Sequence, residues 1–216
     1  MFMHNRRLDQ IRAVLDDGAS VGPLKRITSH FSFLGSDEFL RGNIRVDGAL
    51  EPFGCLGDLG WYCIRFALWT MNWQMPGGVH GRAISRARNN SSGVPLEFSG
   101  ELFFDGGVSS GFYCSFLTAY RNCAEINGTK GHLRLADFVM PAAGSKTAFE
   151  VNDRAVPSDH SADDPTMAQE TNMIRNFANQ ILSGKLNDEW PMWALKTQKV
   201  LDACHEAARH DSPVKI

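Results

Sequence analysis

The segment from residue 96 to residue 118 constrains the fold more than any other part of the chain. Leu96–Phe104 alternates between apolar and polar residues, Asp105-Gly106-Gly107 is typical of a tight hairpin turn, and Val108–Thr118 returns as a partner strand. A second hairpin is predicted over residues 123–135, around Gly128-Thr129-Lys130-Gly131. Consecutive hairpins predict an antiparallel sheet.

The elements on either side of these hairpins decide the fold class. The other predicted helices and strands are helix Leu8–Leu15, strand Pro23–Phe33, helix Gly54–Trp73, strand Val79–Ala87, strand Phe149–Val151, helix Thr166–Leu182, helix Trp193–Arg209 and strand Pro213–Ile216. Helices grouped before and after a run of strands predict an α+β fold. We therefore expect one domain over residues 1–216, with a large, predominantly antiparallel sheet and helices on one face.

The predicted sheet carries aromatic residues on both of its faces. They are Phe98, Phe103, Phe104, Phe112, Tyr113 and Phe116. If both faces are apolar, helices must cover one and a partner subunit the other. The sequence therefore predicts a homo-oligomer, a dimer or a tetramer, that associates through the open face of its sheet.

Composition excludes several classes of partner. The formal net charge is -2, which argues against a nucleic-acid or anionic-membrane surface, and Arg6-Arg7 and Lys25-Arg26 are interpreted as solvated charges. No stretch is long and apolar enough to span a bilayer, and the first residues do not have the pattern of a signal peptide. The five cysteines include no C-x-x-C pair, which indicates a reducing, cytoplasmic location.

The segment Gly54–Trp73 is the strongest candidate for chemistry. On a helix, Asp58, Tyr62 and Arg65 share one face of an otherwise apolar segment, where they could satisfy one another. One interpretation is a polar cluster that binds a hydroxyl or carbonyl group. The other is that Asp58 caps the helix while Tyr62 only packs. The polar loop before it contains Asn43 and Arg45, which we take as substrate-binding candidates together with Arg65.

Motifs for nucleotides and metals are missing from the sequence. Gly54, Gly57 and Gly60 are spaced G-x-x-G-x-x-G, whereas a dinucleotide fingerprint needs G-x-G-x-x-G within a βαβ unit. His205 and His210 are five residues apart and point to different sides of a helix, so they do not form a zinc site. We expect no bound metal and no cofactor-binding residues in this chain.

The predicted order of helices and strands, together with the Gly54–Tyr62 segment, resembles a known family. The order of elements and the run Gly54–Tyr62 are similar to the second domain of the Gfo/Idh/MocA oxidoreductases, which are NAD(P)-dependent and act on sugars, inositols, dihydrodiols and related alcohols. Supporting stretches are Arg7–Gly22, the hairpin run, Glu125–Leu133 and Pro213–Ile216. The resemblance implies that Asp58 helps to place the substrate, that Tyr62 is a catalytic acid or base, and that the open sheet face makes the oligomer interface.

The resemblance also shows what the sequence lacks. In the family, the cation that activates the acid or base is usually the lysine of a Glu-Lys-Pro motif in the first domain, and neither that motif nor a nucleotide-binding domain occurs here. NAD or NADP is therefore the implied cofactor, but we do not expect this chain alone to bind it. Two hypotheses follow: a truncated substrate-binding and dimerisation domain that is not catalytically complete alone, or a stand-alone, non-catalytic ligand-binding or assembly module.

Overall fold

The computed structural model describes residues 1–87, 93–141, 147–157 and 168–216. The chain divides into two compact units, which we describe separately. The first unit comprises Met1–Lys25 and Cys123–Met192, and the second comprises Arg26–Asn122 and Trp193–Ile216. The single-domain organisation stays a prediction.

The second unit is built on the expected sheet. Its strands are β1 (Leu24–Leu34), β2 (Gly78–Arg86), β3 (Pro95–Phe104), β4 (Val108–Ser115), the first part of β5 (Leu117–Gly128) and β9 (Val214–Lys215). They lie in the order β5-β1-β4-β3-β2-β9, and within this unit the β1–β4 pair is parallel while the β2–β3, β3–β4 and β2–β9 pairs are antiparallel. The prediction of a predominantly antiparallel sheet is confirmed.

The first predicted hairpin forms where the sequence signal places it. Phe104 pairs with Val108, and the intervening Gly106 and Gly107 both adopt a φ of 73°. Only glycine adopts this left-handed conformation without strain, so these two residues turn the chain directly from β3 into β4.

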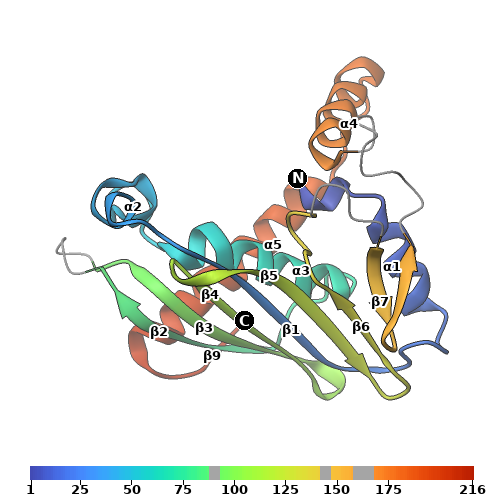
Figure 1. Ribbon diagram of the computed structural model, residues 1–216, viewed down its shortest axis with the longest axis horizontal. Helices are drawn as coiled ribbons and strands as arrows, with labels where there is room; N and C mark the ends of the chain where they lie inside the picture. Colours follow the sequence, from blue (N-terminus) through green and yellow to red (C-terminus); the bar gives the residue numbers. More distant parts are fainter. Residues whose placement is uncertain (88–92, 142–146, 158–167) are drawn as a thin grey trace. The chain divides into compact units, whose positions relative to one another are not determined.

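Helices cover one face of this sheet. Helix α3 (Trp61–Thr70) and the part of α5 (Glu189–His210) that belongs to the second unit lie behind the strands in Figure 1. A Cβ atom on Gly81 would lie 2.3 Å from the carbonyl oxygen of Cys204, so the α5 backbone packs directly against β2. The remaining short helix, α2 (Asp37–Gly42), follows β1 and leads into the loop that carries Asn43 and Arg45.

The expectation that both sheet faces are apolar is wrong for the open face. Phe98, Phe104, Phe112 and Phe116 are all buried, whereas Phe103 is 48% exposed and Tyr113 donates a hydrogen bond to Glu97. The open face also carries an ion pair between Arg26 and Glu101, and the Arg26 guanidinium donates to the Ser109 hydroxyl. The covered face is therefore apolar and the open face is mixed, because the alternate positions of these strands are largely polar.

The first unit contains the second predicted hairpin. Its strands are the last part of β5, β6 (His132–Leu135), β7 (Thr147–Val151) and β8 (Arg154–Pro157), in the order β8-β7-β6-β5. Residues 124–127 of β5 pair antiparallel with β6, and the Gly128 N–H donates to the Gly131 carbonyl across the turn. Strand β8 had no clear sequence signal.

Two helices of the first unit differ from the sequence analysis. In α1 (Arg7–Asp16), Arg7 is not a solvated charge: it is 6% exposed and its guanidinium lies 2.7 Å from the Asp137 carboxylate. Helix α4 (Gln169–Ser183) forms close to the expected bounds, and the expected first residues, 166 and 167, lie outside the described residues. Met173, Phe177 and Ile181 have the spacing of one helix face, which predicts a buried stripe, but they are 36%, 60% and 65% exposed.

Among the residues that the structure describes, no helix has both the length and the apolar character needed to cross a membrane. All five cysteines are free.

Candidate functional site

The candidate segment begins with an irregular turn. Residues Leu56–Gly60 form a π-helical turn in which the Trp61 N–H donates to the Leu56 carbonyl, and α3 then continues to Thr70 rather than to Trp73. Such turns hold one residue more than an α-helical turn and are frequent at functional sites. Asp58 lies within this turn and Tyr62 in the first turn of α3, so both project from the same end of the helix.

Asp58 is paired with Arg45. The Arg45 Nε atom lies 2.8 Å from Asp58 Oδ1, with the two side chains 44% and 24% exposed, respectively. The Asn43 side chain accepts a hydrogen bond of 3.0 Å from the Arg45 N–H and so holds the short turn on which Arg45 sits. Of the two predicted loop residues, Arg45 therefore contacts Asp58 directly, and Asn43 holds Arg45 in place.

Arg65 does not join this cluster, so the expected mutual pairing of Asp58, Tyr62 and Arg65 is wrong for Arg65. Its guanidinium carbon lies 5.5 Å from the centroid of the Trp73 ring, which in turn stacks on Trp193 at 4.6 Å. Burial lowers the pKa of Arg65. The extra residue in the π-helical turn changes the angular relation between Asp58 and later helix positions, which simple α-helical periodicity did not anticipate.

Tyr62 is a half-buried phenol held beside aromatic and charged groups. Its ring meets the Phe31 ring edge-on at a centroid distance of 5.6 Å. The pKa of Tyr62 is raised by burial and then by the negative charge of Asp58, while Arg45 opposes the shift. At neutral pH the phenol is therefore protonated, which makes it a hydrogen-bond or proton donor rather than a base.

Glu51 is a member of the cluster that sequence reasoning missed. Its Oε1 atom accepts a hydrogen bond of 3.1 Å from the Phe53 N–H, and a Cβ atom on Gly57 would lie 2.4 Å from the same oxygen. Burial raises the pKa of Glu51, Asp58 adds to the effect, and Arg45 opposes it. The absence of a side chain at Gly57 therefore makes room for a carboxyl group. In the sequence, Glu51 is only an acidic residue just before the glycines, and this does not distinguish it from other carboxylates in loops.

Together these groups form what we call the Asp58 cluster: Arg45, Glu51, Asp58 and Tyr62. It offers a guanidinium and a phenol as donors and two carboxyl groups as acceptors. Such a set can bind and orient a ligand that carries neighbouring hydroxyl or carbonyl groups. Among the described residues, no group of three or more His, Cys, Asp or Glu side chains is arranged to hold a metal ion.

The glycine-rich turn in the described part of the chain does not have the geometry of a dinucleotide-binding motif. In the described strands, the parallel β1–β4 pair is not a βαβ unit, because α2, α3, β2 and β3 all lie between the two strands in the chain. The glycines at 54, 57 and 60 do not follow a strand. The Glu51 carboxyl group already occupies the space beside Gly57. A pyrophosphate site needs a glycine-rich turn between a strand and a helix N-terminus, and these residues do not provide one.

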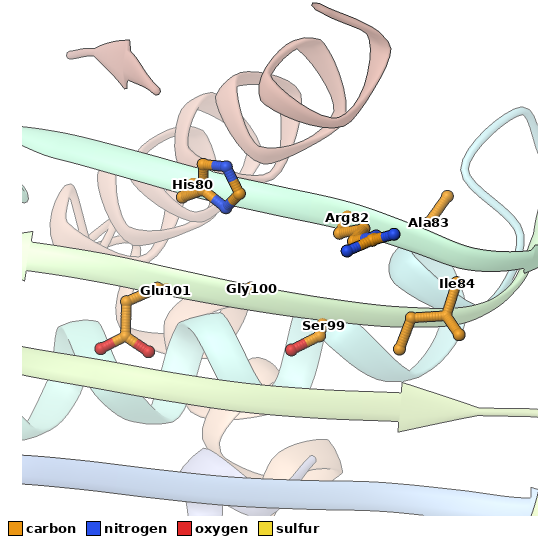
Figure 2. A pocket seen from close by; sticks show the side chains of 7 residues that line it. All are labelled: His80, Arg82, Ala83, Ile84, Ser99, Gly100 and Glu101. Atoms are coloured by element: carbon orange, nitrogen blue, oxygen red, sulfur yellow. The ribbon is translucent and has the colours of Figure 1, made fainter. Parts of the chain in front are cut away.

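A hollow of about 450 Å³ lies elsewhere, on the open face of the sheet in the second unit. His80, Arg82, Ser99 and Glu101 project from β2 and β3 into it, with the helices behind the sheet (Figure 2). The Glu101 carboxylate already forms an ion pair with Arg26. The hollow lies on the face opposite α3 and is not part of the Asp58 cluster.

Substitutions in the cluster are expected to move the pKa of Tyr62 in opposite directions. Asp58→Asn removes the charge that raises this pKa and should lower it, whereas Arg45→Gln removes the opposing charge and should raise it further. The pKa can be measured by pH titration of the ¹³Cζ resonances of labelled tyrosines. The Tyr113 resonance, whose pKa is raised by burial and Glu97, serves as an internal control. Shifts of the same sign in both variants would contradict this assignment of causes.

Comparison with known protein families gives a match over much of the chain. Residues 8–134 match the family model described as the GFO/IDH/MocA C-terminal domain. The matched range contains the whole Asp58 cluster.

Individual relatives agree with this match. The chain is 25% identical over 211 residues to dTDP-3,4-didehydro-2,6-dideoxy-alpha-D-glucose 3-reductase of Actinomadura kijaniata, covering 97% of this chain and 60% of that protein. It is 28% identical over 130 residues to trans-1,2-dihydrobenzene-1,2-diol dehydrogenase of Bos taurus, covering 60% of this chain and 36% of that protein. The chain thus spans between about a third and three fifths of the length of these relatives.

Solved structures share the fold. KijD10, a 3-ketoreductase from Actinomadura kijaniata in complex with NADP and TDP-benzene, has a TM-score of 0.80 and 24% identity, over 95% of this chain and 60% of that one. An aldose-aldose oxidoreductase from Caulobacter crescentus complexed with glycerol also has a TM-score of 0.80, with 19% identity, over 100% of this chain and 62% of that one. At these identities the likeness shows the fold alone.

Proposed function

Because this chain belongs to the Gfo/Idh/MocA family of oxidoreductases, we propose that it is the substrate-binding and dimerisation domain of an NAD(P)-dependent oxidoreductase. Its substrate is a sugar, a polyol or a dihydrodiol. The observation that carries the proposal is the Asp58 cluster, in which a protonated phenol stands beside a carboxylate that is fixed by a guanidinium.

The residues of the cluster have separate roles in this proposal. Asp58 accepts hydrogen bonds from substrate hydroxyl groups, and Arg45, held by Asn43, fixes the carboxylate and offers further donors. Tyr62 donates its proton to the carbonyl oxygen of the substrate during reduction, because its raised pKa keeps the phenol protonated at neutral pH. Arg65 is a substrate-binding candidate only as part of the surface with Trp73, away from the proton transfer.

The relatives indicate the substrate class. One is named as a reductase of a dTDP-linked keto sugar and another as a dihydrodiol dehydrogenase. Both substrates present adjacent oxygen atoms on a six-membered ring, which suits the paired donors and acceptors around Asp58. We extend this chemistry to the present chain as a proposal.

The cofactor belongs to a different part of the enzyme in this proposal. NAD or NADP supplies or accepts the hydride in such oxidoreductases, and the residues of this chain provide binding and a proton only. We further propose a cytoplasmic homodimer or tetramer that associates through the mixed open face of the sheet, where Phe103 is 48% exposed.

One observation favours a second candidate, a stand-alone ligand-binding module without catalysis. Burial and Asp58 together raise the pKa of Tyr62, and Arg45 does not reverse the shift, so the chain by itself does not activate the phenol as a base. Reduction of a keto sugar with NAD(P)H, or oxidation of a diol with NAD(P)⁺, by the purified chain would exclude this candidate.

Ligand binding tests the proposal directly. The chain, labelled at the tyrosine ring carbons, is titrated with trans-1,2-dihydrobenzene-1,2-diol and, separately, with D-glucose. We expect a saturable shift of the Tyr62 resonance with at least one probe, and a roughly 10- to 100-fold weaker affinity in Asp58→Asn, because hydrogen bonds to charged groups contribute about 1.5–3 kcal/mol. Asp47→Asn, at an exposed position in the loop that carries Arg45, is the matched control. Equal losses in the two variants, or no saturable shift with either probe, would refute the proposal.

A further inference from the structure

The backbone at Gly57 does not require a glycine. This residue lies inside the π-helical turn Leu56–Gly60, and its φ is not positive, in contrast to Gly54, whose φ is 53°. Glycine inside a helical turn costs free energy relative to alanine, because it loses more conformational freedom on folding. The glycine at position 57 is therefore explained by the space beside its Cα atom.

The Glu51 carboxyl group fills that space. A Cβ atom at position 57 would lie no more than 3.1 Å from each of Oε1, Cδ and Oε2 of Glu51, so the whole carboxyl group lies against the glycine. The Oε1 atom also accepts a hydrogen bond of 3.1 Å from the Phe53 N–H, which fixes the orientation of the group. The side chain of Glu51 is thus held against the π-helical turn.

The backbone of Glu51 is bonded to the loop that carries Arg45. The Glu51 N–H donates a hydrogen bond of 2.8 Å to the Asp47 carbonyl, and the Asp47 N–H donates to the Ile44 carbonyl at 3.2 Å, which closes the short turn around Arg45. Glu51 therefore contacts one turn through its backbone and the other through its side chain. It connects the segment that carries Arg45 to the segment that carries Asp58.

We propose that Glu51 is a positioning residue that holds Arg45 and Asp58 in contact for the substrate. The inference rests on the proposed function only in that Asp58 binds the substrate. Arg45 and Asp58 come from separate segments and meet at 2.8 Å, so a shift of either segment breaks their contact. Burial raises the pKa of Glu51, and the charges of Asp58 and Arg45 act on it in opposite directions, which agrees with its position beside both.

Two substitutions separate the geometry of Glu51 from its charge. Glu51→Gln keeps an acceptor oxygen and the shape of the side chain but removes the charge, whereas Gly57→Ala keeps the charge and displaces the carboxyl group. The displaced atoms are the end of a flexible side chain, so Gly57→Ala is expected to fold. In the double variant Glu51→Ala/Gly57→Ala, the new methyl group enters the space that the carboxyl group has left.

The contact between Arg45 and Asp58 can be followed without any substrate. The Arg45 Nε–H, which donates to Asp58, is observed in ¹H–¹⁵N spectra of arginine side chains and is assigned by its loss in Arg45→Lys. We expect Gly57→Ala and Glu51→Ala each to accelerate exchange of this proton with water by roughly tenfold, because hydrogen bonds to charged groups are stronger than neutral ones. Glu51→Gln should exchange like the wild type, and the double variant no faster than Glu51→Ala.

Glu38→Ala, which removes an exposed glutamate from α2, is the control and should exchange like the wild type. Circular dichroism first establishes that all variants are folded. Three results would overturn the inference: an unchanged exchange rate in Gly57→Ala, an acceleration in Glu51→Gln as large as in Glu51→Ala, or an equal acceleration in Glu38→Ala. Because no substrate is present, a failure of the diol and glucose titration would refute the proposed function and leave this result unaffected.

Discussion

Replacing Tyr62 with phenylalanine is expected to lower turnover by roughly 10²- to 10⁴-fold, the usual contribution of a positioned general acid. The variant removes only the hydroxyl group, so the edge-on contact with Phe31 and the packing of α3 remain. The raised pKa of Tyr62 keeps its proton available at neutral pH. The measurement is the steady-state rate of the chain supplied with a dinucleotide-binding domain, NADPH and a keto-sugar substrate.

Tyr113→Phe is the matched control for this prediction. Tyr113 is also a hydrogen-bonded tyrosine with a raised pKa, but it donates to Glu97 on the open face of the sheet. Its loss should leave the turnover rate unchanged. A Tyr62→Phe enzyme with an unchanged rate would show that proton transfer does not depend on this residue, and a large loss in both variants would indicate a structural effect.

The second large effect is on stability. Asp137→Asn is expected to lower the free energy of unfolding by about 3–5 kcal/mol, because it leaves the buried guanidinium of Arg7 without its counter-charge. Arg7 is 6% exposed, and its Nη1 atom lies 2.7 Å from the Asp137 carboxylate. Burial already lowers the pKa of Arg7, and Asp137 is the group that opposes this shift. Urea unfolding followed by circular dichroism measures the change.

An ion pair on the same helix whose carboxylate is exposed provides the control. Arg12 and Asp16 are 3.6 Å apart, with side chains 24% and 58% exposed, respectively. Exposed pairs contribute about 0–1 kcal/mol, so Asp16→Asn should change the free energy of unfolding by no more than about 1 kcal/mol. Similar losses in the two variants would show that burial does not set the importance of the Arg7–Asp137 pair.

The parts of the fold that depend only on residues close together in the sequence could be predicted from it. The hairpin at Asp105-Gly106-Gly107 formed as expected, because a turn with two positive-φ glycines requires nothing beyond its own strands. The same holds for the second hairpin, which residues 124–127 and β6 form. Helix α3 ended at Thr70, three residues earlier than predicted, where Asn72 and Trp73 adopt positive φ angles.

The candidate site was only partly predictable. Asp58 and Tyr62 were selected from their spacing and from the family resemblance, and their roles stay predictions. The partner of Asp58 was misassigned, because Arg45 reaches it from a separate loop and Arg65 is turned toward Trp73. Glu51 was missed because its burial depends on the space above Gly57, which exists only once the loop packs against the π-helical turn.

The sequence by itself determined the local elements of this protein: the hairpins and the positions of the main helices. Together with the resemblance that these features support, it also indicated the family. Only the tertiary structure decided which charges are buried and which apolar residues remain uncovered. Arg7 is enclosed and paired with a residue far along the chain, whereas Phe177 is open to solvent on a helix whose polar face packs inward. The physical reason is that hydrophobic periodicity identifies the apolar face of an element, but burial depends on what other parts of the protein cover that face.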